Sequence, residues 1–273
     1  MRADEALRRA AARIGGPTAR LDAEVLLAHL VGMNRNRMLL TSDLWISEED
    51  YDLLVNRRVA GEPVAYIIGT REFWSLDLAV TDAVLIPRPD SETLIAAALE
   101  VCKPPPKRIL DLGTGSGALL LAALSEWPGA TGLGVDASAS ALAVAKGNAG
   151  RLGFGGRADF RLGDWGAGMA ERFDLILSNP PYVEDKAELS AEVRDHEPAS
   201  ALFAGPDGLD DYRRIIPQLP GLMAPGGVAI VEIGSTQASA VLALAAAVGL
   251  IGDVRQDLAG LDRCVVLRDR PAK

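Results

Sequence analysis

The chain has 273 residues, of which 49% are hydrophobic and 24% are charged, and its net charge at pH 7 is −9. A chain of this length and composition can bury a large core, and we expect two domains. The acidic balance argues against a protein that wraps a nucleic-acid backbone, because that function requires clustered Lys and Arg.

The sequence contains no segment that predicts export or membrane insertion. The first residues are charged and lack the apolar core of a signal peptide, and the longest apolar run, residues 238–251, is too short to span a bilayer. The chain has two cysteines, which stand far apart, and two histidines. These numbers favour free thiols and argue against a histidine-based metal site. We therefore expect a soluble cytoplasmic protein without a metal.

Residues 1–72 are predicted to form a small helical domain. Apolar residues recur at helical spacing over residues 6–14 and again over residues 21–30, and a Gly-Gly-Pro break at 15–17 separates the two runs. A third helix is expected to begin at Ser47, which is followed by three acidic residues in the first turn.

The period of the sequence changes at Phe73. Apolar and polar residues alternate from there to Val80, which predicts a strand. We expect a turn at Thr81-Asp82 and a returning strand over residues 83–86. Residues 73–90 would then form a β-hairpin that links the helical domain to the rest of the chain.

Residues 91–273 are predicted to form an α/β domain. Helices separate most of its apolar strands, which indicates a mainly parallel, doubly wound sheet covered on both faces. The expected strands lie at residues 108–112, 132–136, 159–162, 173–178, 227–232, 253–257 and 263–267.

The motif Asn179-Pro180-Pro181-Tyr182 follows one of these expected strands. An amide or ring-amine nitrogen is a poor nucleophile because its lone pair is delocalised. The side-chain carbonyl of Asn179 and the backbone carbonyl of Pro180 can accept its two N–H bonds and turn the lone pair toward an electrophile. The prolines restrict the backbone, and Tyr182 offers a flat face to a planar amide or base. The alternative interpretation is a proline-rich turn after a buried strand.

Residues 109–117 are a strand that runs into a glycine-rich loop ahead of a helical run. Such a loop lets a ligand approach the backbone at a helix N-terminus. A nicotinamide dinucleotide site or a simple turn is the alternative. The G-x-G-x-G spacing differs, however, from the G-x-G-x-x-G that binds a pyrophosphate. The loop residues are Gly113, Thr114, Gly115, Ser116 and Gly117.

Two acidic positions extend this predicted cofactor site. Asp136 ends the next strand, where a carboxylate can accept both hydroxyls of a ribose. The alternative role of Asp136 is to cap the helix that follows, and the two roles can coexist. Asp164 and Trp165 follow the third strand, where an acid and an aromatic ring can flank an adenine.

These motifs together resemble those of the Rossmann-like S-adenosylmethionine-dependent methyltransferases. The order of residues 63–69, 85–92, 197–202 and 207–213 around the Asn-Pro-Pro-Tyr motif is similar, more narrowly, to the HemK/PrmC family of peptide chain release factor glutamine N(5)-methyltransferases. The resemblance extends over nearly the full chain. It is weakest over the first sixty residues, which match mainly as a small helical bundle.

The resemblance implies a seven-stranded, mostly parallel sheet behind a helical domain that recognises the substrate. It implies that residues 113–117 hold the methionine end of S-adenosylmethionine, Asp136 its ribose and Trp165 its adenine. The Asn-Pro-Pro-Tyr motif, with Asn179 also beside the cofactor, would hold the glutamine of a release factor's Gly-Gly-Gln motif. Methyl transfer to that amide nitrogen would leave S-adenosylhomocysteine and support translation termination.

Three further residues are candidates for substrate contact, namely Phe73, Arg88 and Glu197. Arg88 and Glu197 fall in runs typical of the family. The alternatives are a hairpin-closing ion pair for Arg88 and a solvated loop position for Glu197. Phe73 is equally interpretable as a core aromatic residue. The sequence leaves these three open.

Three other functions are alternatives to methylation of a release factor. A sister group methylates glutamine in a large-subunit ribosomal protein, but it typically has Pro-Arg-Ser-Pro where this chain has residues 87–90. Adenine N(6)-methyltransferases of nucleic acid share the Asn-Pro-Pro-Tyr motif. A non-enzymatic adaptor would bind cofactor and partner only. We expect a release factor as the protein partner, no membrane or nucleic-acid partner, and a monomer.

Overall fold

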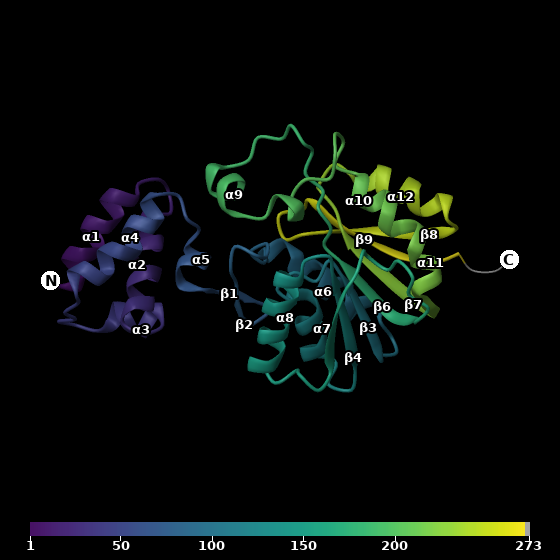
Figure 1. The fold of residues 1–273 in the computed structure, drawn as a ribbon, viewed down its shortest axis with the longest axis horizontal. Helices are drawn as coiled ribbons and strands as arrows, with labels where there is room; N and C mark the ends of the chain where they lie inside the picture. The colour runs from purple at the N-terminus through teal and green to yellow at the C-terminus, as the bar shows by residue number, and fades with distance from the viewer. Residues whose placement is uncertain (271–273) are drawn as a thin grey trace. The chain divides into compact units, whose positions relative to one another are not determined.

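The computed structural model describes residues 1–270, and the chain divides into two compact units (Figure 1). The first unit comprises Met1–Thr70 together with Leu189–His196. The second comprises Arg71–Glu188 and the residues from Glu197 onward. Each unit has buried residues that form its own core.

The first unit is helical, as predicted. Three of its helices match the expected ones, and Ser47 caps the third of these by accepting a hydrogen bond from the Asp50 amide at 3.3 Å. The prediction missed two short helices, because segments of six and five residues are too short to show a helical period. The helices are α1 (Ala3–Ile14), α2 (Ala19–Leu30), α3 (Arg35–Leu40), α4 (Glu48–Val59) and α5 (Val64–Ile68).

The core of this unit lies between α1, α2 and α4. Leu7, Leu26 and Val55 are buried there, one from each helix. Tyr51 is also buried, and its hydroxyl donates a hydrogen bond to the Ala23 carbonyl at 2.7 Å. The apolar periodicity of the sequence therefore corresponds to the buried faces of these helices.

A segment far away in the sequence, α9 (Ala191–His196), belongs to the same unit. Arg58 of α4 joins it to the bundle. Its guanidinium bonds Asp22 of α2 at 2.8 Å and Glu192 of α9 at 3.0 Å. The predicted helical domain, residues 1–72, does not include this segment, because no local sequence pattern indicates such a distant contact.

The β-hairpin lies earlier in the chain than predicted. Its strands are β1 (Thr70–Phe73) and β2 (Leu76–Ala79), and the turn between them is Trp74-Ser75. Both turn residues have positive φ, 51° and 61°, the conformation of the tight turns that match the twist of a hairpin. A turn does form at Thr81-Asp82, where the Thr81 carbonyl accepts the Val84 amide at 3.1 Å, but the returning strand expected over residues 83–86 is absent. The hairpin turn itself escaped prediction because Trp and Ser are not the residues that signal such a turn.

The second unit contains the predicted doubly wound α/β domain. Its sheet has seven strands in the order β5-β4-β3-β6-β7-β9-β8 (Figure 1). The first five are parallel, and β9 runs antiparallel to both of its neighbours. All seven strands were expected. They are β3 (Arg108–Leu112), β4 (Thr131–Asp136), β5 (Ala158–Leu162), β6 (Phe173–Ser178), β7 (Met223–Glu232), β8 (Leu250–Gln256) and β9 (Asp262–Asp269).

Helices cover both faces of this sheet. Along β3 the buried side chains alternate, so Ile109 and Leu110 belong to different core clusters. The cluster of Ile109 includes residues of α6 (Glu92–Val101), α7 (Ala118–Glu126) and α8 (Ala139–Arg151). The cluster of Leu110 includes residues of α10 (Asp210–Ile215), α11 (Leu219–Leu222) and α12 (Ala238–Ala247).

The parallel strands bring their carboxyl ends to one edge of the sheet. Loops that follow parallel strands therefore meet there, although they are far apart in the sequence. The glycine loop follows β3, Asp136 ends β4, and the Asn-Pro-Pro-Tyr motif follows β6. Within residues 1–270, no helix is long and apolar enough to cross a membrane.

Candidate active site

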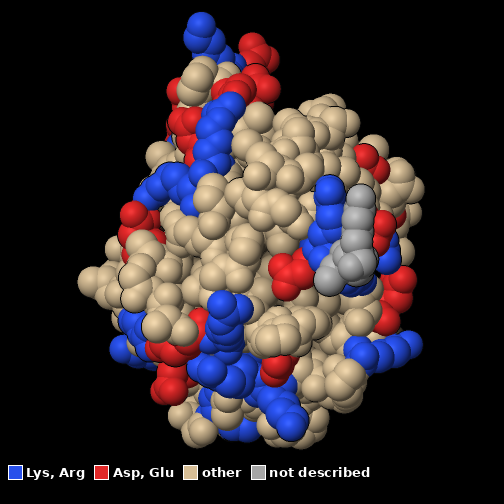
Figure 2. Space-filling model, turned by 90° about the vertical axis from the view of Figure 1, so that its right-hand side faces the viewer, with Lys and Arg blue, Asp and Glu red and all other residues tan. Residues whose placement is uncertain are grey.

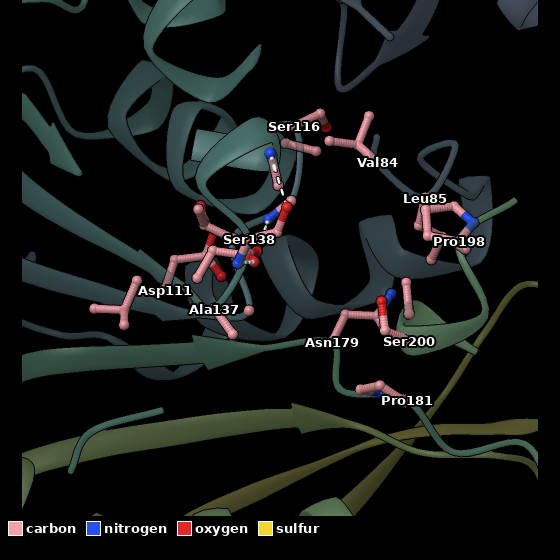
Figure 3. Close-up of a pocket in the computed structure, with 18 of the residues that line it drawn as sticks. Val84, Leu85, Asp111, Ser116, Ala137, Ser138, Asn179, Pro181, Pro198 and Ser200 are labelled. Carbon is pink, nitrogen blue, oxygen red and sulfur yellow. Dashed lines mark hydrogen bonds between the residues drawn. The ribbon is translucent and has the colours of Figure 1, made fainter. Parts of the chain in front are cut away.

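A cavity of about 730 Å³ lies at the carboxyl ends of β3, β4 and β6. In Figure 3, Asp111, Ser116 and Ser138 lie on one side of the view, and Asn179 and Pro198 on the other. The cavity is therefore bounded both by the predicted cofactor loop and by the start of the Asn-Pro-Pro-Tyr motif. Both belong to the second unit.

The glycine loop forms the cavity wall through four of its five residues, from Gly113 to Ser116. Gly113 has φ of 73°, and a Cβ at this position would come within 2.9 Å of the Trp165 ring. A larger residue here would displace that ring or strain the backbone. Gly117 is not part of the wall. Instead it precedes α7 in a left-handed conformation, and its amide donates to the Thr114 carbonyl at 2.8 Å.

Asp136 lines the cavity at the end of β4. One carboxylate oxygen accepts a hydrogen bond from the Gly115 amide at 2.9 Å, and the other accepts one from Ser138 at 2.8 Å. These bonds fix the carboxylate and leave lone pairs for a diol. Ser138, and not Asp136, is the N-cap of α8. The alternative prediction, that Asp136 caps this helix, is therefore wrong, because the cap lies two residues further along the chain.

Asp111 is a buried carboxyl in the cavity wall that the predicted site omits. One oxygen accepts a hydrogen bond from the Thr114 hydroxyl at 2.6 Å, while the other has no partner among residues 1–270. Burial, reinforced by the charge of Asp136, raises the pKa of Asp111 to about 7. An unsatisfied buried acceptor fits a cationic ligand, such as the amino group and sulfonium of S-adenosylmethionine.

Trp165 and Asp164, the two residues that the sequence predicts beside an adenine, also line the cavity. Trp165 has φ of 51°, which turns its ring toward Gly113. The Asp164 carboxylate forms an ion pair with Arg214, and Arg214 also bonds Asp211 at 3.3 Å. Arg214 and Asp211 both belong to α10. Nothing local in the sequence around Asp164 indicates them.

Asn179 follows the last residue of β6 and lines the cavity (Figure 3). Its amide nitrogen donates a hydrogen bond to the Ser91 hydroxyl oxygen at 3.1 Å. The amide oxygen receives no donor from residues 1–270, so it remains an acceptor for a ligand. Pro181 lines the same wall, but Pro180 does not.

Tyr182 does not line the cavity. Its hydroxyl donates a hydrogen bond to Glu232 at 3.3 Å, and its ring packs against the second core cluster. Burial, reinforced by the Glu232 charge, raises the pKa of Tyr182 to about 12. The structure thus brings Asn179 and Pro181 to the cavity, whereas Tyr182 lies outside the cavity wall.

The three open candidates have distinct positions. Arg88 and Glu197 form an ion pair with each other, and Glu197 also accepts a hydrogen bond from the Ile86 amide at 3.2 Å. The Glu197 side chain is only 1% exposed, so the interpretation of a solvated acid is wrong. Neither residue lines the cavity. Phe73 does, and it is also buried in the first core cluster.

Among residues 1–270, no cluster of three His, Cys, Asp or Glu side chains has the arrangement of a metal site. The polar groups near the cavity are instead held by hydrogen bonds to other protein groups. Ser91, Asp111 and Glu232 are the buried ones that the predicted site did not contain. Of these three, Asp111 has a local signal, because it is the next-to-last residue of β3, at the edge of the sheet where ligands bind.

Comparison with known proteins agrees with this architecture. A family model described as "PrmC N-terminal domain" matches residues 5–69, and one described as "Methyltransferase domain" matches residues 103–256. A crystal structure of a methyltransferase from Pyrococcus furiosus has a TM-score of 0.52 at 15% identity, covering 81% of this chain and 98% of that one. At that identity the likeness shows the fold alone.

Curated relatives narrow the family. The release factor glutamine methyltransferase of Rhodospirillum rubrum is 46% identical over 259 residues, which are 93% of this chain and 80% of the relative. That of Bradyrhizobium diazoefficiens is 44% identical over 264 residues, covering 93% and 89% of the two chains. With both parts of the sequence matched, the chain belongs to the release factor glutamine methyltransferase family.

Proposed function

We propose that this protein transfers a methyl group from S-adenosylmethionine to the side-chain amide nitrogen of the glutamine in the Gly-Gly-Gln motif of peptide chain release factors. The observation that carries the proposal is the orientation of Asn179. Its nitrogen is bonded to Ser91, so its carbonyl oxygen is the atom left to accept a substrate N–H. The family relationship supports the choice of release factor as the substrate.

The proposed cofactor residues are those of the glycine loop, Asp136, Trp165 and Asp164. S-adenosylmethionine supplies a methyl group on a sulfonium, which is already an electrophile. Asp136 binds the ribose hydroxyls through a carboxylate that two backbone amides hold in place. Asp111 faces the positive charge with its unpaired oxygen.

The proposed substrate residues act on the amide nitrogen. Asn179 accepts one N–H bond, and the Pro180 carbonyl is proposed to accept the other once the substrate is bound, although Pro180 does not line the cavity in this structure. The two acceptors turn the nitrogen lone pair toward the methyl group. This preorganisation replaces a general base, because the extra proton leaves to water after the new bond has formed. Tyr182 does not line the cavity in this structure, and its ring is proposed to stack on the substrate amide when the substrate binds.

Binding measurements test the cofactor half of this proposal. Asp136→Ala removes a charged acceptor of the ribose hydroxyls, and the cofactor affinity should fall by about 1.5–3 kcal/mol. Calorimetry on folded protein measures the change. Asp253→Asn, an exposed carboxylate on β8, is the control and should bind normally. Unchanged affinity in Asp136→Ala would remove Asp136 from the site.

Transfer assays test the substrate half. The protein is incubated with labelled S-adenosylmethionine and, separately, with a release factor, a large-subunit ribosomal protein and DNA, and the product is mapped by mass spectrometry. We expect label on the Gly-Gly-Gln glutamine. Label on the ribosomal protein or on adenine would favour an alternative substrate. Basic side chains on the face shown in Figure 2 lie beside acidic ones, an arrangement that gives little support to a nucleic-acid substrate.

The helical unit is proposed to recognise the release factor away from the reacting loop. Because release factors act on translating ribosomes, the reaction is proposed to take place in the cytoplasm, by a monomeric enzyme.

A further inference from the structure

Asn148 is a polar residue of α8 that is completely buried and does not line the cavity. The buried residues on either side of it in the helix, Ala145 and Ala149, are small and apolar. Alanine is also a better helix former than asparagine. Neither helix formation nor apolar packing therefore accounts for an amide at this position, so its contacts must.

The Asn148 amide uses all of its hydrogen-bonding groups. Its oxygen accepts the Ala79 amide at 2.7 Å and the Arg151 guanidinium at 3.1 Å. Its nitrogen donates to the Ala79 carbonyl at 3.0 Å and to the Ser116 carbonyl at 2.9 Å. A flipped amide would face two donors with its nitrogen and two carbonyls with its oxygen. The surrounding groups therefore fix one orientation of this side chain.

One of these bonds holds the glycine loop. Three glycines of the loop have positive φ, so the loop backbone has little conformational restriction of its own. The peptide unit between Ser116 and Gly117 is fixed on both sides, because Asn148 donates to its carbonyl and its N–H donates to the Thr114 carbonyl at 2.8 Å. Ser116 lines the cavity (Figure 3). Asn148 thus restricts the loop at a residue of the cavity wall.

The remaining bonds to the backbone hold the end of the hairpin. Ala79 is the last residue of β2, and Asn148 pairs with both its N–H and its C=O, as a neighbouring strand would. Beyond Ala79, the buried Val80 and the turn at Thr81-Asp82 lead to the part of residues 82–85 that lines the cavity. A single side chain therefore joins two segments of the wall that are far apart in the sequence.

We propose that Asn148 is a positioning residue for the cofactor, which sets the glycine loop against residues 82–85 and so fixes the shape of the cavity between them. It acts on the ligand through Ser116 and not by direct contact. Because S-adenosylmethionine is taken as the ligand of this loop, the inference rests on the proposed function. It adds a residue outside the cavity that keeps the empty loop in the shape that binds.

Calorimetry with S-adenosylmethionine tests this role. Asn148→Ala leaves the Ser116 carbonyl and both backbone groups of Ala79 without their partner. The dissociation constant should rise about 10- to 30-fold, because the binding shape of the loop is then only partly populated. In transfer assays the KM for the cofactor should rise in parallel. At saturating cofactor, kcat and the KM for the release factor should stay within about threefold, since Asn179 is untouched.

Phe154→Leu is the matched control. Phe154 follows α8, is buried in the first core cluster and does not line the cavity. Both variants should lower the Tm, because one leaves polar groups unpaired and the other loosens the core. The control should bind the cofactor within about twofold of the wild type. If it loses as much affinity as Asn148→Ala, or if folded Asn148→Ala binds normally, the inference is wrong.

Asn148→Ser keeps the inference testable if Asn148→Ala fails to fold. Its hydroxyl retains one donor, so the loss of affinity should be smaller, about 3- to 10-fold. A lowered Tm with wild-type affinity in this variant would show that Asn148 supports the fold alone, and would overturn the inference. A wild-type protein that binds the cofactor and methylates no release factor would contradict the proposed function. An active wild type whose Asn148 variants bind normally contradicts only this inference.

Discussion

The two polar side chains with the most direct proposed roles, Asp136 and Asn179, are each fixed by a second protein group. Asp136 is held by two backbone amides, and Asn179 is held by Ser91. A fixed acceptor loses little further freedom when the transition state forms, which is the basis of electrostatic catalysis. At the residue scale, the site therefore depends as much on these supporting groups as on the motif residues themselves.

Variants of Asn179 test this account of the motif. Asn179→Ala removes the acceptor, and kcat should fall roughly 10²- to 10³-fold while the cofactor affinity changes little. Asn179→Asp keeps the shape and an acceptor but loses the donor to Ser91, so alignment should again suffer more than affinity. Steady-state kinetics on one release factor measures both. Near-normal kcat in Asn179→Ala would mean that the nitrogen is activated elsewhere.

The buried carboxyl of Glu232 also predicts a pH dependence of stability. Its pKa of about 7 in the folded protein exceeds the ordinary value of 4.5, so its stabilising contribution is present below about pH 4.5 and is lost as the pH rises through 7. Glu232→Gln does not titrate. The Tm of this variant minus that of the wild type should therefore increase by roughly 3–6 °C between about pH 5 and pH 8.

The other groups that face Glu232 are Asp90, Arg263, Tyr182, Tyr212 and Cys264. They are present in both proteins, as is Asp111, whose raised pKa gives the same trend. The difference between the two Tm values therefore isolates Glu232. A difference that is constant with pH, measured by calorimetry in matched buffers, would show that this carboxyl does not change protonation in the window.

The residues proposed to touch the ligands could be predicted from the sequence. The residues that hold those side chains in place could not. Asn179 follows a strand within a distinctive motif, and Asp136 ends a strand after a glycine loop, so local pattern was sufficient. Ser91 and Glu232 follow no such rule, because their contacts with Asn179 and Tyr182 form only where distant segments meet. The placement of Tyr182 outside the cavity wall was not predicted for the same reason.

At the scale of elements, long apolar strands were predictable and short irregular segments were not. The seven strands of the sheet each carry a run of buried residues, which a pattern can detect. The hairpin turn at Trp74-Ser75 has no turn residues to mark it, and the two short helices have no period. The ion pair between Arg88 and Glu197 is likewise a contact between loops, and it joins two segments that both border the cavity.

Removal of one member of this ion pair should loosen both segments. Arg88→Leu leaves the Glu197 carboxylate buried with a single backbone donor, and the free energy of unfolding should fall by about 1–3 kcal/mol, given that Arg88 is partly exposed. The double variant Arg88→Leu with Glu197→Leu should be more stable than Arg88→Leu alone. Denaturant titration measures these values. A raised KM without any loss of stability would instead indicate direct substrate contact by Arg88.

At the scale of the whole molecule, the chain separates two tasks between two units. The unit with the sheet contains every residue of the cavity wall and two of the three core clusters. The helical unit has a core of its own and contributes no residue to that wall. Cofactor binding is therefore expected to depend on one unit alone, while recognition of a large protein substrate remains available to the other.

A truncated variant that begins at Arg71 tests this division. It keeps both strands of the hairpin almost intact, which matters because Phe73 and Leu78 are buried in the core of the remaining unit. Its cofactor affinity should stay within about threefold of the full chain. Its activity on an intact release factor should fall far more than its activity on a short Gly-Gly-Gln peptide, because the peptide offers no surface for the missing unit to bind. Calorimetry and parallel transfer assays on the two substrates measure these changes. An equal loss on both substrates would mean that residues 1–70 support the reacting loop itself, and that recognition of the release factor lies in the unit that carries the cavity.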